Sequence, residues 1–76
     1  MKTIDEIYAF ITVEPHGEEL CVFKVDDIVV PLASHKTEHV AELREIAREY
    51  VRDTGTAVKL VHFCERRLFE TIEPDR

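Results

Sequence analysis

Three histidines and a cysteine are the side chains of this sequence best suited to bind a metal. His35 and His39 are four residues apart, so both imidazoles lie on one side of the expected helix if it begins at Ser34. His62 and Cys64 are two residues apart on an expected strand, hence on one face of a sheet. Because this helix and this strand each span roughly 25 Å, the second pair should return to the end of the domain where the first pair lies. Together they could bind zinc tetrahedrally, although the spacing matches no established zinc motif.

Nucleophilic catalysis has less support in the sequence. Cys64 is followed by Arg66 and Arg67, whose positive charges can activate a thiol, but a nucleophile also needs a base, an orienting group and an oxyanion site. Ser34 is the only serine, and two glycines in the whole chain leave no glycine-rich loop for a phosphate. We therefore expect a protein that is not an enzyme.

Arginines recur every four residues along one flank of the expected helix, at Arg44, Arg48 and Arg52. Such a row could bind phosphates or carboxylates. The simpler interpretation is two ion pairs three residues apart, Glu45 with Arg48 and Glu49 with Arg52. The chain holds 16 acidic against 10 basic residues, a formal charge of -6, and few aromatic residues to spare for stacking. We therefore do not expect it to bind nucleic acid or an anionic membrane.

The first half of the chain has the pattern of short strands. Residues 7–13 are β-branched and aromatic, which favours a strand, and residues 14–17, Glu-Pro-His-Gly, are typical of a tight turn. Residues 20–25 then pair back to form a hairpin. A third strand is expected over 28–32, and it should end early or lie on an edge because Pro31 has no N–H to donate.

The second half predicts a helix followed by a strand. The apolar residues of 37–53 fall on one side of a helix, and Gly55 suits the left-handed residue that closes it. Residues 56–63 predict a strand. A further strand over 67–72 is left open, because residues 64–66 lack the chemistry of a turn.

These elements predict a single α+β domain over residues 1–76. It would have two layers, an antiparallel sheet of four or five strands with one amphipathic helix across it, in the order βββαβ(β).

The longest uncharged runs are seven residues, far below the ~20 that a membrane helix needs. Two cysteines are too few for a secreted disulfide scaffold, and no signal sequence is expected at the N-terminus. A cytoplasmic protein with reduced thiols is the resulting expectation.

One helix covers only one face of a sheet, and two of the expected strands are apolar on both sides. Tyr8 and Phe10 lie on one side of the first strand, opposite other apolar residues, and Val61 and Phe63 lie on one side of the strand after the helix. We take Tyr8, Phe10, Val61 and Phe63 as the candidate face for a second copy or a partner. A homodimer is the simplest cover, since two-fold dimers are the commonest assembly. The alternatives are that the termini fold over this face, or that it is a tolerated apolar patch.

Three stretches, residues 3–13, 17–19 and 55–63, resemble small uncharacterised α/β proteins of bacteria and their phages. The resemblance covers about half of the chain, implies no activity, ligand or functional residue, and favours an accessory binding protein. The leading hypothesis is a small non-enzymatic protein-binding or regulatory domain acting as a homodimer. Residues 1–27, with seven acidic side chains against two lysines, offer a candidate surface for a protein partner. The alternative is a zinc-binding domain that uses the histidines and Cys64.

Overall fold

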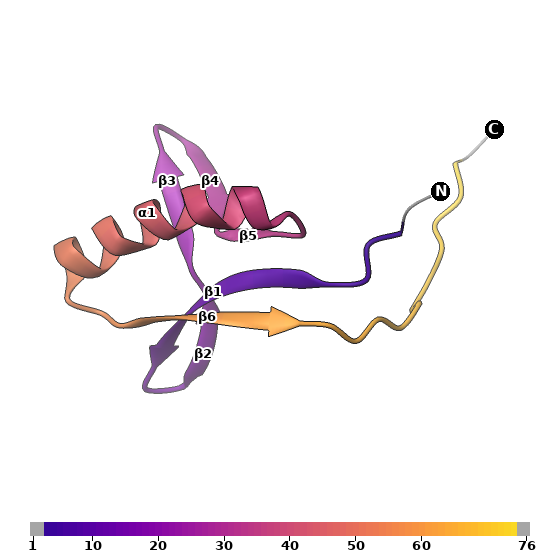
Figure 1. The fold of residues 1–76 in the computed structure, drawn as a ribbon, viewed down its shortest axis with the longest axis horizontal. Helices are drawn as coiled ribbons and strands as arrows, with labels where there is room; N and C mark the ends of the chain where they lie inside the picture. Colours follow the sequence, from indigo (N-terminus) through magenta and orange to yellow (C-terminus); the bar gives the residue numbers. More distant parts are fainter. Residues whose placement is uncertain (1–2, 75–76) are drawn as a thin grey trace.

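A central strand, β1 (Ile7–Glu14), organises the fold, because three other strands pair with it. The structure is a computed structural model that describes residues 3–74. Along one edge of β1, the antiparallel strands β2 (Gly17–Leu20) and β5 (Ala33–Ser34) lie end to end, and β6 (Val58–Phe63) pairs antiparallel along the other edge (Figure 1). The predicted α+β class, with strands first, then one helix, then a strand, is confirmed.

A second hairpin, β3 (Val22–Val25) and β4 (Ile28–Pro31), leaves the sheet between β2 and β5 (Figure 1). Two backbone hydrogen bonds join its base to β1, and a third closes the base between Cys21 and Leu32. The Phe10 N–H donates to the Leu32 carbonyl (2.9 Å), the Cys21 N–H to the Phe10 carbonyl (2.8 Å), and the Leu32 N–H to the Cys21 carbonyl (2.9 Å). The side chains of Cys21 and Leu32 are 1% and 0% exposed, so this junction is also the centre of the core.

The junction corrects one prediction. A continuous strand was expected over 20–25, but it is interrupted at Cys21, whereas the strand expected over 28–32 ends one residue early. The reason is a change of partner, since Leu20 pairs with β1 whereas the residues from 22 onward pair with β4. The apolar residues on both sides of Cys21 carry no sign of such a change. Pro31 ends β4, as its missing N–H led us to expect.

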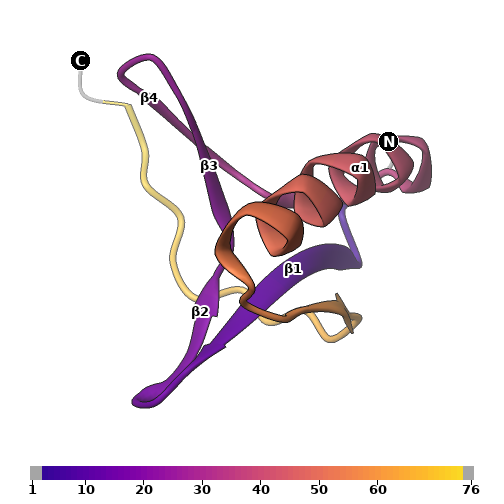
Figure 2. The ribbon, with the colours of Figure 1, turned by 90° about the vertical axis from the view of Figure 1, so that its left-hand side faces the viewer.

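The helix α1 (Thr37–Thr54) confirms the prediction over 37–53. Gly55 closes it in the left-handed region (φ 73°), and the Gly55 N–H donates to the Val51 carbonyl at 2.8 Å. The helix contacts β1 and β5 and crosses over β1 (Figure 2). Its buried residues, Val40 and Ala47, pack against Phe10 and the junction residues of the core.

The core is small for the amount of apolar surface in the chain. Seven hydrophobic residues are buried, whereas fifteen large ones are exposed among the described residues. Residues 64–74 form no helix or strand, so the strand left open over 67–72 is not formed within the described part of the chain. This segment runs on from β6 as an extended chain, away from the sheet (Figure 1).

Candidate interaction surfaces

The face of the sheet turned away from α1 is apolar and open. Side chains alternate along a strand, and because Phe10 packs under the helix, its neighbours Ala9 and Ile11 point to the opposite face. Cross-strand partners share a face, so the pairing of the strands gives the remaining members. We call this surface the open face; it consists of Ile7, Ala9, Ile11, Val13, Glu18, Leu20, Ala33, Lys59, Val61 and Phe63.

The open face is buried in its middle and exposed at its margin within residues 3–74. Ala9 and Ile11 in its middle are 5% and 9% exposed, since β1 has strands on both edges. Around them, large apolar side chains are about half exposed: Ile7 43%, Leu20 43%, Val13 47% and Phe63 52%. Several large apolar side chains exposed on one face are typical of an interaction site.

The four residues predicted as one partner face do not lie together. Tyr8 pairs with His62 and Phe10 with Leu60, and this set faces the helix, where Phe10 is 4% exposed in the core. Val61 pairs instead with Ala9, so Val61 and Phe63 lie on the open face. The sequence showed that both sides of the strands are apolar, but it did not show which side of one strand matches which side of another. The register of pairing decides that.

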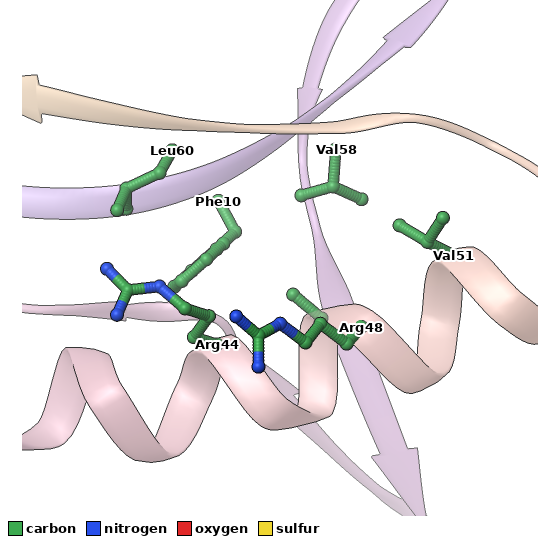
Figure 3. A pocket seen from close by; sticks show the side chains of 7 residues that line it. Phe10, Arg44, Arg48, Val51, Val58 and Leu60 are labelled. Atoms are coloured by element: carbon green, nitrogen blue, oxygen red, sulfur yellow. The ribbon is translucent and has the colours of Figure 1, made fainter.

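A groove of about 310 Å³ opens between α1 and β6. Phe10, Val58 and Leu60 form its apolar wall on the sheet, and Arg44 and Arg48 extend from the helix on its near side (Figure 3). Arg48 makes the expected pair with Glu45, with Nη1 and Oε1 2.8 Å apart and both side chains exposed. A groove with an apolar wall and two guanidinium groups suits an extended segment that carries apolar and carboxylate side chains.

The histidines predicted as metal ligands lie at one end of the sheet but in separate environments. Tyr8 pairs with Ser34 on one edge of β1 and with His62 on the other. The His62 ring stacks on the Tyr8 ring, with centroids 4.5 Å apart, and His62 Nε2 lies 2.8 Å from Glu6 Oε2. His39 Nδ1 lies 3.4 Å from the Ser34 hydroxyl oxygen, on the far side of Tyr8. The predicted return of the strand to this end is therefore correct for His62.

The candidate zinc ligands are not gathered into one site. Across residues 3–74, no group of three or more histidine, cysteine, aspartate or glutamate side chains is placed to hold a metal ion. His35 is exposed near the N-terminal segment, and His62 is already engaged by a ring and a carboxylate. Cys64 is exposed beyond the end of β6. The arrangement therefore adds no support to the zinc hypothesis.

The two thiols have opposite surroundings. Cys21 is buried at the junction, and burial raises the pKa of its thiol, which disfavours the reactive thiolate. Cys64 is exposed and free. Cys21 is thus a packing residue, and Cys64 is the accessible thiol of the described residues.

The sequence did not reveal how exposed the extended segment after β6 is. Leu68, Phe69 and Ile72 are 73%, 96% and 85% exposed, although the composition had suggested that most aromatic residues serve the core. A possible signal was the absence of turn residues after Phe63, which leaves the segment no tight bend by which to fold back.

Comparisons with protein-family models, with curated proteins and with solved structures give no match for this chain. The helix of the described residues is not apolar enough to cross a membrane.

Proposed function

We propose that this chain is a small, non-enzymatic protein-binding domain that acts as a homodimer. The observation that carries the proposal is the open face, on which large apolar side chains at its margin are 43–52% exposed. In a domain of this size the buried core contributes little stability, so covering a second apolar face would stabilise the fold as well as the assembly. A second copy is always available to provide that cover.

The hairpin tips offer a surface for a different protein. Glu18 and Glu19 on β2 and Asp26 and Asp27 at the tip of the β3–β4 hairpin are all exposed. The exposed pair Asp26 and Asp27, on a tip outside the open face, favours a partner with a basic surface, and its contribution to binding falls as salt screens the charges. A regulatory or accessory role, exerted through such contacts, is the function we propose.

The mass of the untagged chain in solution tests the homodimer. We expect light scattering after size exclusion, at micromolar concentration, to give about twice the chain mass of 8.9 kDa. Dilution should shift the mass toward that of one chain, because the association is reversible. A constant mass of one chain at every concentration up to a few hundred micromolar would contradict the proposal.

A further inference from the structure

The strand β6 has one edge without a strand partner. Within residues 3–74 it pairs only with β1, so the backbone groups along its outer edge are free to accept another strand. The groove with Arg44 and Arg48 lies beside β6 on the helix side. A strand added at this edge would therefore place alternate side chains in the groove and on the open face.

The extended segment after β6 has the composition of a strand that could pair with this free edge. Residues 68–73, Leu-Phe-Glu-Thr-Ile-Glu, combine exposed apolar side chains with two carboxylates and no basic residue. Aromatic and β-branched residues favour a strand. Phe69, at 96% exposed, makes almost no contact within its own chain, which is the expected state of a side chain whose partner lies elsewhere.

We propose that residues 68–73 of each copy pair antiparallel with β6 of the other copy in a reciprocal exchange. The inference rests on the proposed homodimer and adds to it a contact at the outer edge of β6, beside the open face. Each sheet gains a strand, and each groove is filled by the partner copy. Exchange of identical elements is a low-cost route to a two-fold dimer, because each copy gives and receives the same contact.

One register matches the two segments side chain by side chain. With Phe63 opposite Phe69, Lys59 falls opposite Glu73, which joins opposite charges. The same register sets Leu60 opposite Ile72, Val61 opposite Thr71 and His62 opposite Glu70. A shift by one residue toward Leu68 would instead set Val61 opposite Glu70 and Lys59 opposite Ile72, which pairs charged with apolar side chains.

The register also agrees with the faces of the sheet. Leu60 lines the groove, so the partner's Ile72 would enter it, and Glu70 would lie on the same face of the sheet, opposite His62. Phe63 is on the open face, and Phe69 of the partner would lie beside it.

The connection between the two segments favours the second copy over closure within one chain. In this register a hairpin would need a three-residue loop of Glu65, Arg66 and Arg67. Three-residue hairpin loops commonly have glycine in a left-handed conformation, and none of these residues provides it. The chain instead continues away from the sheet (Figure 1).

A disulfide between Cys64 and a new cysteine at position 68 tests the exchange. In the proposed register the two positions are directly opposite across the strands, at about 4.5–5.5 Å between Cα atoms, which a disulfide can span. We expect Leu68→Cys, oxidised mildly, to run at twice the chain mass on a non-reducing gel and at one chain mass after reduction. Ile72→Cys is the matched control, since four residues along the strand move its thiol ~13 Å away. Cys64→Ser in the Leu68→Cys background should abolish the link.

The outcomes separate this inference from the proposed function. A disulfide formed within one chain, seen as loss of both thiols at one chain mass, would show a hairpin and overturn the exchange. Absence of any link while light scattering of the unmodified chain still gives a dimer would also overturn it and leave the homodimer standing. An unmodified chain that is monomeric throughout would overturn both. Equal linking of the Leu68→Cys and Ile72→Cys variants would show a disordered segment and refute the register.

Discussion

Replacing Phe63 with alanine should weaken self-association of the chain. Phe63 is 52% exposed on the open face. A phenylalanine side chain buries about 200 Å², so roughly 100 Å² is available to a partner copy. At about 25 cal/mol per Å², covering this area contributes about 2.5 kcal/mol per copy and about 5 kcal/mol per two-fold dimer. Ordering of side chains offsets part of this gain, so we expect a net loss of about 2.5 kcal/mol, or a Kd raised roughly 60-fold.

A dilution series followed by sedimentation or light scattering measures this change. Val29→Ala is the matched control, because Val29 is 56% exposed on β4, outside the open face. We expect the control to keep the Kd of the unmodified chain, and circular dichroism should show that both variants are folded. If Phe63→Ala associates as tightly as the unmodified chain, or if Val29→Ala weakens association equally, the open face is not the interface.

Four further predictions concern the fold and the candidate ligands. Leu32→Ala should lower the free energy of unfolding, measured by urea denaturation, by about 2–5 kcal/mol, because Leu32 is 0% exposed at the junction. A loss below about 1 kcal/mol would contradict this packing. Gly55→Ala should lower stability by about 1–2 kcal/mol through backbone strain alone, since φ is 73° and no atom lies within 4 Å of an added Cβ; Gly55→Asn should cost less. The Glu38 pKa is lowered, chiefly by a hydrogen bond from its own backbone N–H, so the charged carboxylate stabilises the fold above the ordinary carboxyl pKa and this effect is lost as pH falls through the lowered value. Glu38→Gln should therefore have a lower free energy of unfolding than the unmodified chain at pH 7, and the two values should converge in acid. Elemental analysis of untagged protein should find no stoichiometric zinc, because Tyr8 and Glu6 engage His62; one zinc per chain would refute this.

The elements of the fold could be predicted where one local pattern decides the structure. The apolar side of α1 and the left-handed Gly55 after it are sufficient to place the helix. The turn between β1 and β2 follows from Pro15 and Gly17 in the same way. These features depend on residues within a few positions of each other, so the sequence contains all the information needed.

The features that depend on partners far along the chain could not be predicted. The interruption at Cys21 arises because a hairpin pairs with itself beyond that point, and apolar residues lie on both sides of the break. The assignment of Tyr8 to the helix side and of Val61 to the open face depends on the register between β1 and β6. The groove depends on both the helix position and that register, so the row of arginines indicated that carboxylates could bind but not the apolar wall beside them.

The ring of backbone hydrogen bonds among Phe10, Cys21 and Leu32 has a consequence for how this fold can diversify. The arm between Cys21 and Leu32 projects from a stem that is sealed at its root. Phe23 near the root packs against the core, whereas the tip at Asp26 and Asp27 is exposed, so the remaining strands do not depend on what the tip contains. A longer loop or a foreign peptide could be grafted there while the parent scaffold stays intact. The position is a natural insertion point at which new recognition specificities can be installed.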